Sequence, residues 1–536
     1  MSTRARTVGD YVVELLALNG IDTVFGIPGV HNIELYRGLE SARLRHVLVR
    51  HEQNAGFAAD GYARASGRPA AAFVISGPGL TNVLTATAQA YSDSVPLLVI
   101  ASTPARATLG KRWGVLHELN DQLALAAGVT SVARSASTVE DVRDHLCAAL
   151  TSLRSARARP AYVGIPLDLL AEPTTQPAER FAPPRGSPQA PVDAIEAAAA
   201  LLNGAQRPLI IAGGGARGAG DVLRQLVEAL DAYLVTTAAG KGVLAESHPA
   251  SLGASLPYGI TQELIGAADV VLAVGTELSE TDIFYGMRLR IAGRLIRIDI
   301  DPVRLADQYG PEVALWGDAR TTLQALARSC TPRSGWCTRA GGSARHRAAI
   351  EEQFDANGRA FSAVLSSLRQ STPPDAIVFS DMTQIAYHGI YAFAAERPGV
   401  WVHPSGYGTL GHALPAALGA KIAQPQRAVL ALAGDFGLGF TMQELTTAVE
   451  CELALPIVVW NNGALGQIRD DMLRAGITPL GVVARNPDFV ALARACGAEA
   501  VRVATLEMLG ERIRAALERR GPTLLELASG DFVQAR

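Results

Sequence analysis

A carboxylate and an amide stand at the ends of two apolar segments in the last third of the chain. The segment VLALAGD (429–435) ends at Asp435, and PIVVWNN (456–462) ends at Asn462, 27 residues later. That interval holds one helix and a return strand, and parallel strands end at the same edge of a sheet, so the two side chains can converge. Mg²⁺ prefers oxygen ligands and often sits against phosphates. The spacing therefore predicts a magnesium site.

A glycine-rich turn follows at the same point. The backbone amides of Gly434, Phe436 and Gly437, at the start of a predicted helix, can bind the oxygens of a diphosphate. Each piece also has a purely structural interpretation, with Asp435 as a helix cap and Asn461-Asn462-Gly463 as a turn. We favour the ligand hypothesis because the two motifs occur together at this spacing.

Short β-branched segments alternate with longer helical stretches along the chain, and these elements must position the candidate ligands. Examples are HVLV (46–49), AAFVI (71–75), PLLVIA (96–101) and PAYVGIP (160–166). The alternation predicts an α/β fold of doubly wound parallel sheets. Two segments poor in aliphatic residues, 173–191 and 331–347, are interpreted as linkers. The predicted domains are therefore 1–172, 192–330 and 350–536.

The composition excludes several classes of protein. The chain of 536 residues has 48 Lys and Arg against 51 Asp and Glu, so its net charge of −3 gives no general attraction for nucleic acid or anionic lipid. The cysteines form neither a disulfide framework nor a zinc motif; they are Cys147, Cys330, Cys337, Cys451 and Cys496. Hydrophobic residues make up 49% and charged residues 18%, which predicts large buried surfaces and an oligomer.

The N-terminal segment and the apolar runs indicate where the protein resides. Residues 1–20 are better explained by an amphipathic helix, with Val12, Val13 and Leu16 inward, than by a signal peptide. The longest apolar runs are far shorter than the ~20 residues that a membrane helix needs. We therefore expect a cytoplasmic protein.

The predicted central domain carries a weaker motif. Gly213, Gly215 and Gly218 follow an apolar strand in the pattern G-x-G-x-x-G, but no acidic residue ends the next strand, where a ribose would be held. We favour a turn that allows close packing, and nucleotide binding by this domain stays open. Asp299 and Asp301 are expected to cap the turn at Pro302 rather than to bind a ligand.

The arrangement of Asp435 and Asn462 resembles the signature of thiamin-diphosphate-dependent enzymes, a G-D-G motif followed at a similar interval by N-N. The resemblance implies that Asp435, the Asn462 side chain and the Ala464 carbonyl bind Mg²⁺. The third glycine of the motif is Phe436 here, at a position that acts largely through its backbone.

A distant segment supports the resemblance. Residues 50–64, RHEQNAGFAADGYAR, closely match the family's segment around a glutamate that protonates a pyrimidine nitrogen of the cofactor. By that resemblance Glu52 is the catalytic acid, and it meets a cofactor held by the neighbouring subunit, which implies a homodimer or homotetramer. The alternative is an acid that merely stabilises a helix start.

Further segments are similar to the family's cofactor loops. Pro28 in GIPG (26–29) and Pro78 with Asn82 in SGPGLTN (76–82) would wall the pyrimidine. In GYGTLG (406–411), Leu410 would wedge between the two cofactor rings and the Gly408 carbonyl would accept a hydrogen bond from the pyrimidine. We expect two more cofactor contacts, from Thr383 and Gln384.

The resemblance implies a decarboxylase or carboligase of 2-oxo acids, or an acyl-CoA lyase. The resemblance implies a shared beginning, in which the cofactor's ylide adds to a ketone, carbon dioxide leaves and an enamine remains. The enamine then reacts with a proton or with a second carbonyl group. His31 and His117 lie in segments that line the site in relatives, and imidazoles with pKa values near neutrality suit proton delivery. A structural role for either histidine is equally open.

The sequence resembles acetolactate synthases overall but departs from them where their substrates bind. Asp471 replaces a tryptophan, and His117-Glu118 replaces a Phe-Gln pair. The central domain lacks the synthases' His-Gly segment associated with flavin, so FAD is not expected. Carboxylates suit a guanidinium, which they bind bidentately, so Glu118, Asp470 and Asp471 are candidate substrate contacts. Alternatively, the two aspartates pair with Arg469 or Arg474 on a solvated helix face.

Three segments (26–39, 45–64 and 109–122) are similar to decarboxylases of 5-guanidino-2-oxopentanoate, the 2-oxo acid of arginine. The leading hypothesis is therefore a thiamin-diphosphate-dependent, non-oxidative decarboxylation of that acid. The alternative is an acetolactate synthase or another carboligase that acts on pyruvate. A non-catalytic regulatory relative is a third hypothesis, against which the presence of Glu52 together with Asp435 and Asn462 argues.

Overall fold

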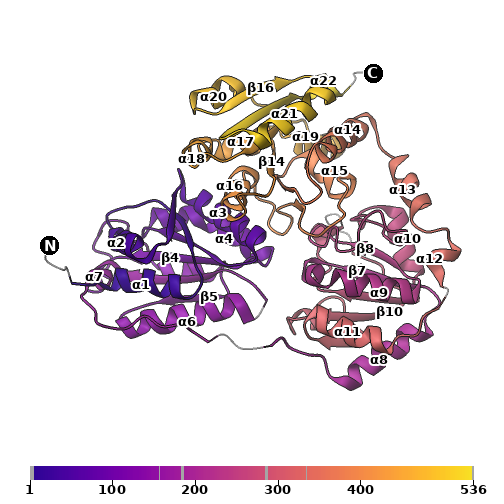
Figure 1. Cartoon of the computed structure of the whole chain (residues 1–536), viewed down its shortest axis with the longest axis horizontal. Coiled ribbons are helices and arrows are strands. Elements are labelled where there is room, and N and C mark those ends of the chain that lie inside the picture. Colours follow the sequence, from indigo (N-terminus) through magenta and orange to yellow (C-terminus); the bar gives the residue numbers. More distant parts are fainter. Residues whose placement is uncertain (1–4, 156, 183–185, 284–287, 334, 534–536) are drawn as a thin grey trace. The chain divides into compact units, whose positions relative to one another are not determined.

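The computed structural model describes residues 5–155, 157–182, 186–283, 288–333 and 335–533. The chain forms two compact units (Figure 1). The first comprises Met1–Pro184, Gly406–Arg502 and Ala515–Glu526, and the second comprises Arg185–Ser405, Val503–Arg514 and Leu527–Arg536. The strands form three sheets, and every strand pair described is parallel. The predicted α/β class of parallel sheets is confirmed.

The first sheet has the order β2-β1-β3-β4-β6-β5. Its strands are β1 (Thr23–Gly26), β2 (Arg45–Leu48), β3 (Ala70–Val74), β4 (Leu97–Thr103), β5 (Val132–Ser135) and β6 (Ala161–Pro166). Its helices are α1 (Val8–Leu18), α2 (Ile33–Ala42), α3 (Glu52–Ser66), α4 (Pro78–Ser92), α5 (Gln122–Ala127), α6 (Val139–Ser155) and α7 (Leu167–Ala171). Helices α1 and α6 pack on one face, with α3 and α4 on the other (Figure 1). Residues Val12, Val13 and Leu16 of α1 are fully buried, as predicted.

The second sheet, in the second unit, has the order β11-β10-β9-β7-β8. Its strands are β7 (Pro208–Ala212), β8 (Tyr233–Thr236), β9 (Val270–Val274), β10 (Arg294–Asp299) and β11 (Val313–Trp316). Around it lie α8 (Val192–Gly204), η1 (Gly214–Ala219), α9 (Gly220–Leu230), α10 (Gly259–Ala267), η2 (Glu280–Asp282), η3 (Arg304–Ala306), α11 (Ala319–Ser329), α12 (Trp336–Arg339) and α13 (Ala344–Glu351).

The third sheet has the order β13-β12-β14-β15-β17-β16. Its strands are β12 (Ile377–Ser380), β13 (Trp401–Val402), β14 (Val429–Gly434), β15 (Leu455–Asn461), β16 (Glu499–Val503) and β17 (Pro522–Ala528). Its helices are α14 (Ala356–Gln370), α15 (Gln384–Ala392), α16 (Ala413–Ala423), α17 (Asp435–Thr441), α18 (Glu444–Glu450), α19 (Gly466–Arg474), α20 (Phe489–Ala495), α21 (Leu506–Glu518) and α22 (Ser529–Phe532). Each sheet draws its strands from one predicted domain, while the domain bounds themselves stay a prediction.

The turns of the second unit agree with the structural interpretations. A Cβ atom on Gly213 would lie 2.4 Å from the Gly275 carbonyl oxygen, so this glycine permits close packing. Asp299 accepts a hydrogen bond from the backbone N–H of Asp301, and Asp301 accepts one from that of Val303, which are turn-capping contacts. One interpretation was incomplete: the linker 331–347 contains α12, and Cys337 is buried in the core because its segment is anchored by Asp231.

Helices α3 and α16 cross in the first unit with their backbones in contact. A Cβ atom on Gly61 would lie 1.9 Å from the Ala416 carbonyl oxygen, and one on Gly419 would lie 1.8 Å from that of Ala58. Only glycine fits at such a crossing. The helix that begins at Glu52 is therefore fixed against the segment that precedes β14.

Two further findings concern the chain as a whole. No helix in the described ranges is both long and apolar enough to cross a membrane. All five cysteines are free thiols, in agreement with the absence of a predicted disulfide framework.

Candidate active site

Four candidate site residues follow four neighbouring strands of the first sheet. Glu52 comes after β2, His31 after β1, Ser76 after β3 and His117 after β4, and the sheet order places these strands side by side. Parallel strands end at one edge, where open α/β sheets bind their ligands. The topology therefore gathers these side chains.

Glu52 is the first residue of α3 and is half-buried. The Nδ2 atom of Asn82 donates a hydrogen bond of 2.9 Å to Glu52 Oε2. The cap of α3 is His51, whose ring accepts from the Gln53 N–H, so the helix does not need Glu52 as its cap. Burial, and after it the charge of Glu52, raises the pKa of Tyr36. The sequence predicted both Glu52 and Asn82, and the structure brings them together.

His31 and His117 form a pair. Their ring centroids lie 4.8 Å apart at an angle of 63°, and His31 Nδ1 lies 2.5 Å from Ser76 Oγ. Burial lowers the pKa of His31, and the neighbouring His117 lowers it further. His31 is therefore mainly neutral at pH 7, with one ring nitrogen protonated. The buried Nδ1 of His117 has no hydrogen-bond partner among the described residues.

The backbone at His117 is strained. Its φ is 63°, in the left-handed region that residues other than glycine seldom adopt. Gly77, with φ of 65°, packs against it so closely that a Cβ atom there would lie 2.6 Å from the His117 carbonyl oxygen. Such strain gathers at functional sites. The neighbouring Glu118 is half-buried and accepts from the Gly114 N–H at 2.8 Å.

A second group of polar residues lies at the ends of β14 and β15, which pair in register up to Gly434 and Trp460. The buried carboxylate of Asp435 accepts from Asn486 Nδ2 at 2.7 Å and from the backbone N–H groups of Phe436 and Gly463. Asn462 Oδ1 accepts from the Ala464 N–H at 3.1 Å. Burial raises the pKa of Asp435, and these hydrogen bonds partly offset it.

This group fits a hard divalent cation. The predicted donors are the Asp435 carboxylate, the Asn462 amide oxygen and the Ala464 carbonyl, all of them oxygen atoms. The Gly463 N–H donates to Asp435 and so joins the ends of β14 and β15, while the convergence of the Asp435 and Asn462 oxygen atoms stays a prediction. No group of three or more His, Cys, Asp or Glu residues in the described ranges is arranged to hold a metal. The mixed set at the ends of β14 and β15 stays a predicted metal centre.

Phe436 does not disturb the turn. Gly434 is the N-cap of α17 with an extended backbone, and Phe436 lies inside the helix without a positive φ. A side chain is therefore allowed where the related motif has glycine. Gly437 beside it is buried.

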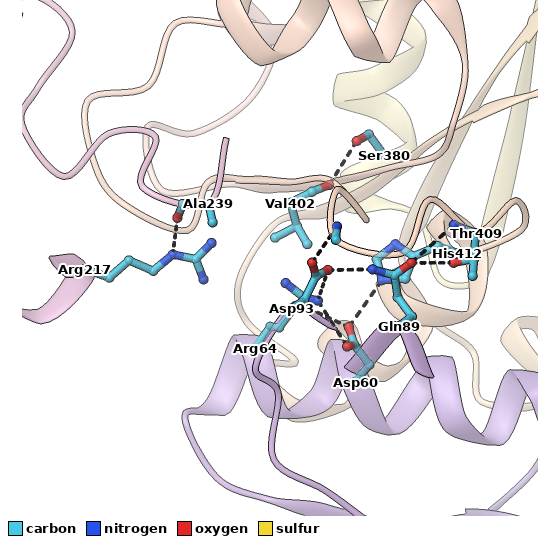
Figure 2. A network of polar contacts seen from close by, with 11 residues as sticks. Asp60, Arg64, Gln89, Asp93, Arg217, Ala239, Ser380, Val402, Thr409 and His412 are labelled. Atoms are coloured by element: carbon cyan, nitrogen blue, oxygen red, sulfur yellow. Dashed lines mark hydrogen bonds and ion pairs between the residues drawn. The ribbon is translucent and has the colours of Figure 1, made fainter. Parts of the chain in front are cut away.

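The loop Gly406–Gly411 is tied to α3 and α4 by a network of polar contacts (Figure 2). Asp93 Oδ1 accepts from the Gly406 N–H at 2.9 Å, and Gln89 Oε1 accepts from the Thr409 hydroxyl at 2.8 Å. Gly408 and Leu410 are half-exposed between these contacts. The remaining predicted cofactor contacts lie as follows: Pro28 and Pro78 are exposed at the ends of β1 and β3, while Thr383 and Gln384 begin α15 in the second unit.

The two aspartates of α19 are paired with arginines. Asp470 lies 3.1 Å from Arg469, and Asp471 contacts Arg474 and accepts from Gln467 Nε2 at 3.2 Å. The alternative interpretation, in which the two aspartates pair with arginines of the same helix, therefore agrees with their contacts in the structure. A guanidinium ligand would have to compete with arginines of the chain itself.

Sequence reasoning missed two residues of the site. Asn486 joins Asp435 to Asn461, whose Oδ1 accepts from Asn486 Nδ2 at 3.0 Å. Glu444 of α18 accepts from Asn54 Nδ2 at 2.9 Å and from the Arg50 N–H at 2.8 Å. It thereby links α18 to the segment that carries Glu52. Neither residue belongs to a motif of recognisable spacing.

Three segments of the chain match domain families. Residues 6–125 match the N-terminal TPP binding domain of thiamine pyrophosphate enzymes, residues 195–326 match their central domain, and residues 381–527 match their C-terminal TPP binding domain.

Whole proteins are also similar. A protein of Pseudomonas aeruginosa named probable 2-ketoarginine decarboxylase is 50% identical, with 97% of this chain and 94% of the relative covered. The acetolactate synthase isozyme 1 large subunit of Escherichia coli is 31% identical over 87% of this chain and 84% of its own length. An acetolactate synthase large subunit of Parasynechococcus marenigrum is 30% identical over 96% and 86%.

Proposed function

The chain belongs to the thiamine pyrophosphate enzymes, and from that premise we propose that it decarboxylates 5-guanidino-2-oxopentanoate (2-ketoarginine) without oxidation. Carbon dioxide leaves, a proton bonds to the keto carbon that carried the carboxylate, and 4-guanidinobutanal is the product. The observation that supports the reaction type is the contact between the His31 and His117 rings, which follow β1 and β4 of the sheet whose strand β2 precedes Glu52. The substrate follows from the similarity to a 2-ketoarginine decarboxylase.

The polar groups at the ends of β14 and β15 would hold the cofactor's diphosphate through Mg²⁺. Asp435, Asn462 and the Ala464 carbonyl are the proposed metal ligands, with the backbone of 434–437 on the phosphates. Pro28, Pro78, Gly408, Leu410, Thr383 and Gln384 complete the proposed cofactor contacts. Bound thiamin diphosphate supplies a carbon nucleophile and an electron sink for the loss of carbon dioxide.

Glu52 holds the proton that the pyrimidine nitrogen needs. Asn82 donates to Oε2 and so orients the carboxyl group, and Oε1 would be the oxygen left to interact with the cofactor. Replacing Glu52 by Gln removes this acid while it keeps the shape. We expect carbon dioxide release to fall by a factor of about 10² to 10⁴. Unchanged release from every 2-oxo acid tested would favour the non-catalytic relative instead.

The histidines deliver the proton that replaces the carboxylate. Because burial keeps His31 mainly neutral, its ring acts as a relay, which takes up a proton at the unprotonated nitrogen as it gives up the one on its N–H. Ser76 Oγ fixes the ring through Nδ1. His117 Nδ1, which has no hydrogen-bond partner in the part of the chain that the structure describes, is available for a further contact. A nearby proton donor favours aldehyde release over attack on a second carbonyl, which separates a decarboxylase from a carboligase.

Glu118, Asp470 and Asp471 are the proposed contacts to the substrate's guanidinium, which would displace Arg469 and Arg474 from the two aspartates. The test compares carbon dioxide release from 5-guanidino-2-oxopentanoate, pyruvate and benzoylformate, with an assay for acetolactate. We expect the guanidino acid to have the highest kcat/KM. Preference for pyruvate with acetolactate as product would replace this proposal by the synthase. Asp471→Trp is expected to raise KM for the cationic acid and to leave pyruvate unaffected.

The same proposal includes assembly and location. A homodimer or homotetramer with the active site at the subunit interface would join Glu52 of one subunit to a cofactor held by another. The exposed apolar side chains Val30, Trp113 and Leu116, near the predicted site loops, support such a contact. We propose that the enzyme acts in the cytoplasm.

A further inference from the structure

The loop Gly406–Gly411 is anchored at every third residue. Asp93 accepts from the Gly406 N–H, and Gln89 Oε1 accepts from both the backbone N–H of Thr409, at 3.2 Å, and its hydroxyl. His412, which follows the loop, lies 3.2 Å from Asp60 Oδ1 through its Nε2. All three anchors therefore come from α3, α4 and the residue after α4.

The anchoring side chains hold one another in place (Figure 2). Gln89 Nε2 donates to Asp93 Oδ2 at 2.8 Å, and Arg64 donates to the same oxygen at 2.7 Å. Arg64 also donates to Asp60 Oδ1 at 2.6 Å. Gln89 and Asp60 are fully buried, so the network is preorganised and its groups have little access to water that could replace a lost partner.

The positions between the anchors are those assigned to the cofactor. Thr409 is buried, whereas Gly408 and Leu410 on either side of it are half-exposed. Gly408 and Gly411 have φ values of 71° and 86°, which fixes the path of the loop. Thr409 is held by Gln89, and its two neighbours in the loop are more accessible than Thr409 itself.

We propose that Gln89 and Asp93 are positioning residues, which hold the Gly406–Gly411 loop so that Gly408 and Leu410 grip the pyrimidine half of thiamin diphosphate. This inference rests on the proposed function, which assigns Gly408 and Leu410 to that half. The two residues act through the loop and touch no reacting atom. The diphosphate half is held elsewhere, by the ends of β14 and β15, so the two halves of the ligand can be tested separately.

The test variant is Gln89→Met, which has a similar shape and no hydrogen-bonding group at its end. Binding to the cofactor-free chain is measured by calorimetry at saturating Mg²⁺ with two probes, thiamin diphosphate and inorganic pyrophosphate. Two hydrogen bonds to Thr409 are lost, so we expect the Kd for thiamin diphosphate to rise about tenfold or more. The Kd for pyrophosphate, which has no ring, should not change.

Gln424→Met is the matched control. Gln424 Nε2 donates to the Ala65 carbonyl at 3.3 Å and so also ties the segment after α16 to α3, but it does not touch the loop. Both Kd values should equal those of the wild type. An equal rise for both probes in Gln89→Met, or no rise for thiamin diphosphate, would overturn the positioning role.

A milder pair of variants covers the case in which Gln89→Met does not fold. Thr409→Val removes only the hydroxyl donor, and Thr409→Ser keeps it. We expect a several-fold weaker binding of thiamin diphosphate in the first and recovery in the second, again with pyrophosphate unaffected; equal binding by the two would contradict the role. If the wild type itself binds pyrophosphate but not thiamin diphosphate, the proposed function fails and not the anchoring.

Discussion

Because the rings of His31 and His117 lie close together, the protonation of His31, and with it the proposed proton delivery, should depend on pH. The pKa of His31 is lowered first by burial and second by the charge that His117 carries when protonated. Because the pKa of His31 is lowered from the ordinary value near 6.5, His31 in the wild-type enzyme should be mainly neutral at pH 6.5 and become protonated only at lower pH. The acid side of its pH–rate profile then lies on the acidic side of 6.5.

His117→Asn removes the second cause and leaves the first. The pKa of His31 should therefore rise, but stay below its ordinary value because burial remains, and the acid limb of kcat/KM should move to higher pH. The pH dependence of kcat/KM for 5-guanidino-2-oxopentanoate measures the shift, with Ser76→Thr as a control that keeps the hydroxyl at His31 Nδ1. An acid limb that stays in place or moves to lower pH would contradict the coupling.

Among single residues, those that belong to a motif could be predicted from the sequence, and those outside any motif could not. Asp435 and Asn462 were predicted from their type and spacing, and Glu52 from the resemblance of its segment; their roles stay a prediction. In the structure Asn82 contacts Glu52 and Asn486 contacts Asp435. Asn486 follows an irregular segment after α19, so nothing in its spacing indicates that it will reach Asp435. The contact between His31 and His117 depends on sheet order, which periodicity does not give.

Helix α3 owes its position to buried charges as well as to the glycine crossing. Burial alone would raise the pKa of Asp60, but Arg64 and His412 lower it to about 2. A carboxyl group with a folded pKa below its unfolded value near 3.9 stabilises the fold above pH 4 or so. That contribution is lost as the pH falls through the range from about 4 to about 2.

Asp60→Asn should therefore destabilise the protein strongly at neutral pH. The buried Arg64 would keep only Asp93 as a charged partner, and breaking a buried pair costs about 3–5 kcal/mol. Urea unfolding followed by circular dichroism measures the change. The control is Glu312→Gln, which breaks the exposed pair with Arg294 and should cost about 0–1 kcal/mol. A loss for Asp60→Asn no larger than that of the control would contradict the argument.

The main strands and helices were more predictable from the sequence than the segments that connect them. The alternation of β-branched runs and helical stretches sufficed to predict parallel sheets, because a strand buried on both faces is apolar along its length, as β3 is. The segment 331–347 lacks that pattern, yet it forms α12 because Asp231 accepts hydrogen bonds from the Gly335 and Thr338 backbone. Such tertiary anchors leave no periodic trace in the sequence.

Under the proposed function, a single chain does not supply both Glu52 and Asp435 to the same active site. Glu52 begins α3, which follows β2 of the first sheet, and Asp435 begins α17, which follows β14 of the third. The resemblance places Glu52 at the cofactor that a neighbouring subunit binds. In a twofold-symmetric dimer, each site then takes Glu52 from one chain and Asp435 from the other. Glu52→Gln and Asp435→Asn chains are each expected to be inactive alone.

Mixed chains should recover activity because a heterodimer concentrates both defects in one site. Its other site combines the intact Glu52 of one chain with the intact Asp435 of the other. Equal amounts, co-expressed with two different affinity tags, give heterodimers as half of the population, each with one working site of two, so about a quarter of wild-type activity is expected. Tandem purification of the heterodimer should raise this to about half. Activity that stays at the level of the single variants would mean that each chain builds its site alone.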